Sequence, residues 1–154
     1  MTEATPFAFG EDPDHPGWHS WQLRDTTRYN AFLGLLLVRR EGDAARVRMF
    51  PERRHTNLQD GVHGGTTLGF IDVALFAAAR MLGLIAAGSA VTLDLSTQFI
   101  GVGRADVPLD AEVDLLRETR RLIFMRGLVV QEGATIAAFS GTIRKSVGAG
   151  LADA

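Results

Sequence analysis

Residues His55 to Asp72 read HTNLQDGVHGGTTLGFID, and this stretch decides the fold. Its polar first half leads to His63-Gly64-Gly65, after which an apolar run continues well beyond the quoted stretch. Small and hydroxyl-bearing residues before an apolar run are typical of a helix N-terminus, and a glycine after the run is typical of its end. We therefore predict one long helix from Thr66 to Ala87, capped by Gly65 or a following threonine and stopped by Gly88.

The predicted helix is apolar on nearly every side, and one flat sheet face could not cover it. Its apolar stretch is about as long as a membrane span, which needs roughly 20 residues. However, it carries Asp72 and Arg80, each of which would cost about 2.5–3.5 kcal/mol at the centre of a bilayer. We therefore interpret it as the central helix of a globular domain.

Alternating apolar and polar residues predict strands on both sides of this helix. The segments Leu35–Arg40 and Arg46–Pro51 flank a Gly-Asp turn, which is typical of a hairpin. A short helix from Trp21 to Leu33 is expected before the hairpin. After the long helix, short connections predict an antiparallel meander of four strands. These strands are expected at residues 90–100, 107–117, 122–130 and 135–144.

Together these elements predict an α+β domain in which an antiparallel sheet of about six strands wraps around one long central helix. The chain of 154 residues has the length of one domain, which we place at residues 21–146. Residues 1–20 are rich in proline, glycine and acidic side chains, and we expect a flexible, loosely packed lead-in there. We expect residues 147–154 to form a flexible tail.

Composition excludes several classes of function. The formal net charge of −2 gives no electrostatic footprint for nucleic acid or an anionic membrane. The chain has no cysteine and no GxSxG or phosphate-binding glycine motif, so it offers no thiolate or serine-elbow nucleophile. His15 and His19 lack a convincing third ligand, and we expect no metal site. No signal-peptide pattern opens the chain, so we expect a cytoplasmic protein.

Asp72 is the residue that the helix pattern does not explain. Its neighbours Phe70, Ile71 and Val73 leave little room for a polar helix face, and a buried carboxylate is costly unless it is used. A desolvated carboxylate suits a general base or a nucleophile that works near neutral pH. The alternative is an aspartate on a solvent-facing edge of the helix, without a task. We favour the catalytic interpretation.

Gly64 and Gly65 stand where the helix is expected to begin. Free backbone N–H groups at a helix N-terminus can hold a carbonyl oxygen as it becomes an oxyanion, and glycine lets a substrate approach that backbone closely. A tight turn would explain the same two glycines. His63 is consistent with a core or capping histidine, Asn57 with a loop residue, and Thr92 with an ordinary threonine on the polar face of a strand.

The spacing of Gly64 and Asp72 limits how both could serve one site. Eight residues of helix separate them by about 12 Å, whereas a base and an oxyanion donor must converge to within roughly 3 Å of a shared reacting atom. Two chains with antiparallel helices would bring Asp72 of one chain opposite Gly64 of the other. If both residues are functional, the protein is a dimer with two sites at its interface.

Asn57, His63-Gly64-Gly65 and Asp72, at this spacing, resemble the HxN…VHGG…D signature of PaaI-like hotdog-fold acyl-CoA thioesterases. The resemblance covers residues 30–145, and AVTLDLSTQFI at Ala90–Ile100 and GTIRK at Gly141–Lys145 are similar to strands of that family. It implies a sheet wrapped around a central helix, assembly into dimers or tetramers, and active sites at the dimer interface.

The resemblance also implies the reaction, which is hydrolysis of an aryl- or medium-chain acyl-CoA without metal or cofactor. By position, Asp72 corresponds to the catalytic base or nucleophile and Gly64 to the backbone donor that polarises the thioester carbonyl. His63 and Asn57 correspond to side chains that support the carbonyl, the thiolate or water. Thr92 corresponds to a hydroxyl that helps to place the hydrolytic water in some members.

Some positions depart from the family pattern. Asp60 stands where a glycine is usual, three residues before the histidine. Phe76 stands where some members carry a hydroxyl, four residues after the acid. In a later turn, Arg120 and Arg121 could meet the phosphates of CoA or could be ordinary solvated charges.

Two other functions stay open from the sequence. A non-catalytic acyl-CoA-binding protein of the same fold would carry much the same residues. A hotdog dehydratase or hydratase would need a catalytic histidine paired with an acid in another arrangement, which the sequence does not contain.

Overall fold

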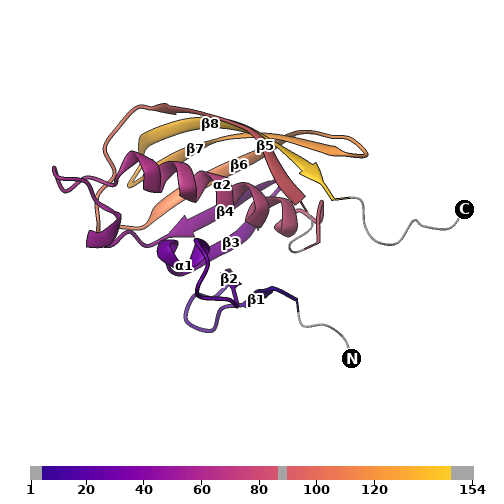
Figure 1. Ribbon diagram of the computed structural model, residues 1–154, viewed down its shortest axis with the longest axis horizontal. Coiled ribbons are helices and arrows are strands. Elements are labelled where there is room, and N and C mark those ends of the chain that lie inside the picture. Colours follow the sequence, from indigo (N-terminus) through magenta and orange to yellow (C-terminus); the bar gives the residue numbers. More distant parts are fainter. Residues whose placement is uncertain (1–4, 87–89, 147–154) are drawn as a thin grey trace, which may run out of the picture.

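The computed structural model describes residues 5–86 and 90–146, and the tail expected at 147–154 lies outside these ranges. One long helix, α2 (Gly64–Met81), lies across one face of an antiparallel sheet (Figure 1). It packs against strands from both halves of the chain. The predicted α+β class and the single central helix are therefore confirmed.

Helix α2 begins two residues before the predicted start, at Gly64. His63 is the N-cap, because its Nδ1 accepts a hydrogen bond of 2.8 Å from the Gly65 N–H. The expected caps, Gly65 and the threonines after it, therefore lie inside the helix. The side chain of a histidine can satisfy a free N–H of the first turn in the same way as the oxygen of a serine.

The helix ends at Met81, earlier than the predicted Ala87. Gly83 lies just past the end with φ of 74°, a left-handed conformation that glycine adopts readily. Its N–H bonds the Arg80 carbonyl at 3.0 Å, and the Leu84 N–H bonds the Ala79 carbonyl at 2.9 Å. This pair of bonds is a Schellman motif, so Gly83, rather than the predicted Gly88, stops the helix.

The sheet has eight strands in the order β1-β2-β3-β4-β6-β7-β8-β5, instead of the six predicted. The predicted hairpin and the four later strands are present, with ends shifted by one or two residues. The strands are β1 (Phe7–Glu11), β2 (His19–Leu23), β3 (Leu36–Glu41), β4 (Ala44–Met49), β5 (Ala90–Phe99), β6 (Leu109–Glu118), β7 (Leu122–Gln131) and β8 (Ala134–Lys145).

The two additional strands lie in the segment that was expected to be a lead-in. Alternating apolar residues in FAFGE and HSWQL let β1 and β2 pair, and β2 then extends the sheet at β3 (Figure 1). The helix predicted from Trp21 to Leu33 is present only at its C-terminal end, because Trp21 belongs to β2 and is buried. Within residues 5–86 and 90–146, the helical elements besides α2 are the short α1 (Asn30–Leu33) and a 3-10 turn (Arg53–His55).

The prediction of a four-strand meander was also wrong. Strands β6, β7 and β8 form one, but β5 pairs with β8 and occupies the edge of the sheet. Residues 100–108 carry the chain from that edge back to β6, between β4 and β7. The open edge of β5 therefore lies at the opposite end of the sheet from β1 (Figure 1).

The core lies between α2 and the sheet. Phe70, Ile71, Ala74 and Leu75 of α2 are fully buried, and they meet apolar residues that alternate along β3, β4, β6, β7 and β8. None of the helices within the described ranges has the length and hydropathy needed to span a membrane.

Candidate active site at helix α2

One stripe of α2 stays incompletely buried. It comprises Gly65, Leu68, Gly69, Asp72 and Phe76, each of which lies three or four residues from another member and so shares one helix face. The remaining faces are held in the core. Asp72 therefore lies on the one accessible side of a helix that is otherwise enclosed.

Asp72 and Thr92 are in direct contact. The Thr92 hydroxyl, on the edge strand β5, donates a hydrogen bond of 2.6 Å to Asp72 Oδ1. Both side chains are partly buried. Among the described residues, no donor pairs with the other carboxylate oxygen, Oδ2, so one oxygen is held by Thr92 and the other keeps its capacity to accept a proton or a hydrogen bond.

An apolar cavity of about 200 Å³ opens beside Asp72. Its walls come from α2, from the N-terminal strands and from the start of β5, and the only charged group among them is the Asp72 carboxylate. The remaining residues of the wall are Phe7, Trp21, Asn30, Val73, Phe76, Ile85 and Ala90.

The start of α2 forms a second group of candidate residues. The Gly65 N–H is bonded to His63 Nδ1, whereas the Gly64 N–H has no acceptor among the described residues. Of the two glycines, Gly64 is thus the one with a donor available at the positive end of the helix dipole. A Cβ at Gly64 would lie 3.5 Å from the ring of Phe99 in β5.

Asn57 organises the loop that leads into α2. Its Oδ1 accepts hydrogen bonds from the Gln59 N–H at 2.9 Å and the Gly61 N–H at 3.1 Å. Together with the exposed His63, Asn57 lines an open groove of about 620 Å³ over this loop. Asp60, in the same loop, has φ of 61°, a conformation that explains why a glycine is usual at this position.

The structure thus places the predicted residues in two groups on one helix. Asp72 and Thr92 meet at the middle of α2, and Asn57, His63 and Gly64 gather at its start. Eight residues of intact helix separate Asp72 from Gly64, which corresponds to about 12 Å. One chain does not bring the two groups together.

Arg120 and Arg121 are exposed in the turn between β6 and β7. They line neither the cavity beside Asp72 nor the loop groove. The Arg121 carbonyl accepts a hydrogen bond from the N–H of Lys145, which pairs with Ala90 at the cavity wall. With strands about 4.8 Å apart, this turn lies roughly 10 Å from the cavity.

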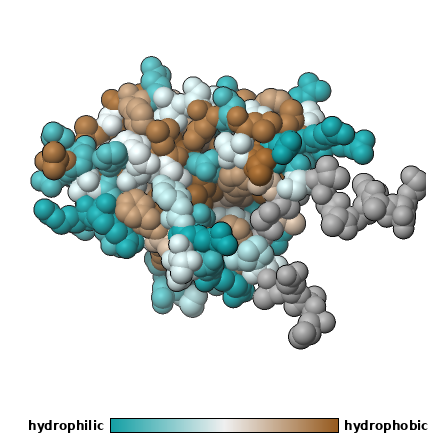
Figure 2. All heavy atoms as spheres, viewed as in Figure 1, coloured by the Kyte–Doolittle hydropathy of each residue, from teal (hydrophilic) through white to brown (hydrophobic). Residues whose placement is uncertain are grey.

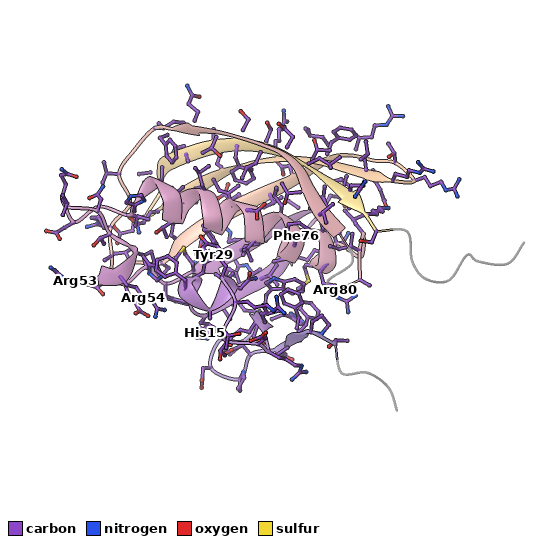
Figure 3. The ribbon with its side chains drawn as sticks, in the orientation of Figure 1. His15, Tyr29, Arg53, Arg54, Phe76 and Arg80 are labelled. Atoms are coloured by element: carbon purple, nitrogen blue, oxygen red, sulfur yellow. The ribbon has the colours of Figure 1, made fainter. Side chains whose placement is uncertain are left out.

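Sequence reasoning missed several residues at this face. Phe7 and Trp21 lie in β1 and β2, in place of the predicted lead-in and helix, and the alternation of aromatic residues in this segment is a signal for strands. Tyr29 was also missed, and it lies along the same side of α2 as Phe76 (Figure 3). A Cβ at Gly69 would lie 1.9 Å from the Tyr29 hydroxyl, so this mid-helix glycine makes room for the tyrosine.

A cluster of charges covers the sheet face that points away from α2. Asp110, of which 6% is exposed, accepts hydrogen bonds from Arg46 and Arg48. Burial alone would raise the pKa of Glu41, but hydrogen bonds from Arg46 and Arg39 lower it below its ordinary value. Burial likewise opposes the charge on Arg46, yet its acidic partners raise its pKa. This cluster supports the sheet rather than the cavity.

Comparison with known proteins gives a family match and several structural matches. The family described as the thioesterase superfamily matches residues 60–138, just over half of the chain. A comparison with curated protein sequences found no match.

Many solved structures are similar to this chain, and three of them illustrate the likeness. A mutant of the phenylacetic acid degradation protein PaaI from Thermus thermophilus is 28% identical with a TM-score of 0.60, over 73% of this chain and 94% of its own. PaaI from E. coli is 22% identical with a TM-score of 0.65, over 75% and 82%. A hypothetical thioesterase protein from Streptococcus pneumoniae, solved with coenzyme A, is 17% identical with a TM-score of 0.62, over 71% and 87%. The last two likenesses show the fold alone.

Proposed function

The chain belongs to the thioesterase superfamily and has an eight-stranded form of its hotdog fold, and on this premise we propose that it hydrolyses acyl-CoA thioesters. The observation that carries the proposal is the Asp72 carboxylate, which is held by Thr92 at the wall of an apolar cavity. An acyl chain in that cavity would place its thioester carbonyl near a carboxylate with one oxygen that keeps its capacity to accept a proton. The similarity in fold to a hypothetical thioesterase protein solved with coenzyme A supports CoA as the thiol.

In the proposed reaction, Asp72 takes a proton from a water molecule as the water attacks the thioester carbonyl carbon. The Gly64 N–H of the partner subunit stabilises the oxyanion that forms. Collapse of this intermediate breaks the C–S bond, and the proton held by Asp72 goes to the thiolate. Direct attack by Asp72, followed by hydrolysis of the resulting anhydride, would use the same groups.

Dimerisation through β5 would complete the site. In an antiparallel pairing of two β5 strands centred between Leu95 and Ser96, Thr92 lies opposite the partner's Phe99. Because Phe99 packs on Gly64 within each chain, this pairing brings Gly64 of the partner subunit toward Asp72.

The surface of β5 supports this assembly. An unpaired edge strand with apolar side chains is a natural site of pairing between chains. Hydrophobic side chains gather on the face formed by α2 and β5 (Figure 2). The exposed large apolar residues on and just after β5 are Val91, Leu93, Phe99, Ile100 and Val102.

The other predicted residues have supporting roles in this proposal. Since His63 Nδ1 caps α2, its exposed Nε2 is the atom left to approach the carbonyl or the leaving thiolate. Asn57 acts through the loop that its side chain holds. Arg120 and Arg121 are proposed to bind CoA phosphates, so replacing both by alanine should raise KM with little change in kcat.

Release of free thiol from a panel of acyl-CoAs, followed with a thiol reagent, tests the function. We expect turnover by the wild-type protein and a fall in kcat of about 100-fold or more for Asp72→Asn, the scale of losing a general base. Asp43→Asn, at an exposed aspartate in the turn between β3 and β4, is the matched control and should keep its activity. Binding of acyl-CoA without any thiol release would instead indicate a non-catalytic binding protein.

Mixing two inactive variants tests the shared site. Gly64→Pro removes the proposed oxyanion donor, yet proline is well tolerated at the first position of a helix. Each mixed dimer of Asp72→Asn and Gly64→Pro chains contains one intact site. Random exchange should therefore restore about a quarter of wild-type activity. A mixture that stays inactive, although mass spectrometry shows mixed dimers, would contradict a site built from two chains.

A further inference from the structure

The cavity beside Asp72 is built by two separate parts of the chain. Val73 and Phe76 of α2 lie within the segment that matches the superfamily, residues 60–138. Phe7 of β1 and Trp21 of β2 lie outside that segment. The N-terminal strand pair therefore supplies a wall of the cavity that the matched segment of the family does not provide.

This aromatic wall is firmly held on one side. Trp21 is only 2% exposed, and the backbone of β2 pairs with β3 at the two preceding residues. Phe7 stacks on Trp21 with ring centroids 4.2 Å apart and planes inclined by 18°. Phe9, the next residue on the same face of β1, makes a T-shaped contact with Trp21, with ring centroids 5.9 Å apart, but does not line the cavity.

The size of the cavity restricts what it can hold. Its volume is about 200 Å³, below the roughly 300–1,000 Å³ of pockets for drug-sized ligands. An apolar protein cavity of about 150 Å³ can hold a benzene molecule. The space beside Asp72 therefore suits a single aromatic ring with a short linker, or a short aliphatic chain, and is too small for a long fatty acyl chain.

We propose that strands β1 and β2 form the end wall of the acyl pocket, and that Phe7 sets the upper limit on acyl size. This inference rests on the proposed thioesterase function and adds a substrate class to it, namely CoA thioesters of compact apolar acids. Trp21 is the fixed part of the wall because it is packed into the core. Phe7 is the adjustable part, since it is only half-buried and lies on the outermost strand.

The test measures kcat/KM for acyl-CoAs from acetyl to palmitoyl, together with benzoyl-CoA and phenylacetyl-CoA. It compares the wild-type protein with the variants Phe7→Ala, Phe7→Trp and Phe9→Ala. We expect the wild-type protein to prefer the compact acyl groups. Phe7→Ala enlarges the pocket and should raise kcat/KM for longer chains by about tenfold or more, while Phe7→Trp should lower kcat/KM for the largest wild-type substrates. Phe9→Ala is the matched control, from the same strand and face, and should keep the wild-type order of preference.

Two measurements keep the outcome interpretable. Thermal denaturation shows whether Phe7→Ala is folded, and Phe7→Leu offers a smaller apolar side chain if it is not. Calorimetric binding of non-hydrolysable thioether analogues of the same acyl-CoAs reports on the pocket without hydrolysis.

If no acyl-CoA is hydrolysed but the length profile of analogue binding shifts in Phe7→Ala, the thioesterase proposal fails and the wall is supported. If acyl-CoAs are hydrolysed but Phe7→Ala shifts the acyl-length profile of neither kcat/KM nor analogue binding, the proposed role of Phe7 in the pocket wall is wrong. The same conclusion follows if Phe9→Ala shifts these profiles as much as Phe7→Ala does. If no analogue binds to the wild-type protein, the cavity beside Asp72 is not an acyl pocket, and the proposed wall is overturned with it.

Discussion

Thr92 Oγ1 donates a hydrogen bond of 2.6 Å to Asp72 Oδ1, and this bond joins the edge strand β5 to helix α2 at the wall of the cavity. The bond fixes the direction of the carboxylate before any substrate binds. It also ties the proposed base to the strand through which two chains are proposed to pair. Thr92 is therefore assigned to positioning Asp72, and through it the attacking water.

Loss of the Thr92 hydroxyl should slow catalysis with little effect on substrate binding. Thr92→Val keeps the shape of the side chain, and we expect kcat to fall by about tenfold, which corresponds to about 1.4 kcal/mol for one charge-assisted hydrogen bond. KM should stay close to the wild-type value. Thr92→Ser, which keeps the hydroxyl, should recover most of the rate. Equal kcat values for the valine and wild-type proteins would contradict this role.

Asp60 holds a left-handed conformation, with φ of 61°, that glycine adopts without strain. We expect Asp60→Gly to raise the free energy of unfolding by about 0.5–1 kcal/mol and Asp60→Val to lower it by a similar amount or more. Thermal denaturation measures both changes. Gln59→Gly, at the neighbouring exposed position without positive φ, is the control and should be slightly destabilising. A loss of stability in Asp60→Gly would mean that the aspartate side chain itself supports the loop.

Gly127 of β7 lies where two strands and an aromatic ring converge. A Cβ there would lie 2.0 Å from the Glu112 carbonyl oxygen and 2.5 Å from the Phe139 ring. Since a backbone oxygen cannot move aside cheaply, Gly127→Ala should lower the free energy of unfolding by about 3 kcal/mol or more. Gly10→Ala in β1, where nothing lies within 4 Å, should be neutral or stabilising. Urea denaturation of the two variants gives the comparison, and a small effect at Gly127 would contradict the tight strand contact.

The charge cluster on the outer sheet face should make stability depend on pH. Because Arg46 and Arg39 lower the pKa of Glu41 in the folded protein, its contribution is present above the ordinary carboxyl range and is lost as the pH falls through the lowered pKa. Glu41→Gln should therefore be less stable than the wild-type protein at pH 7. The difference should shrink below about pH 4.

Urea denaturation at several pH values measures this difference. The control is Glu11→Gln, an exposed residue that makes none of the ion pairs found within residues 5–86 and 90–146. A gap between Glu41→Gln and the wild-type protein that stays constant with pH would argue against the ion pairs as its cause.

Much of the fold could be predicted because local patterns agree with the tertiary structure. The apolar run after His63 produces α2, and the alternation after it produces four strands. Errors arose where two patterns competed. Gly83 and Gly88 are both plausible stop signals, and only the bonds that the chain makes around Gly83 decide between them. Trp21 fits a helix or a strand equally well until an edge of β3 is available for pairing.

The candidate site also has features that the sequence determines and features that depend on the tertiary structure. The sequence by itself determined that a carboxylate, Asp72, stands on an apolar helix eight residues after Gly64, because helix geometry depends only on neighbours along the chain. The tertiary structure alone decided that Thr92 bonds Asp72 and that Phe7 and Trp21 enclose the space beside it. Those contacts join residues far apart in the sequence, and such contacts follow from the order of strands in the sheet, which no local pattern specifies.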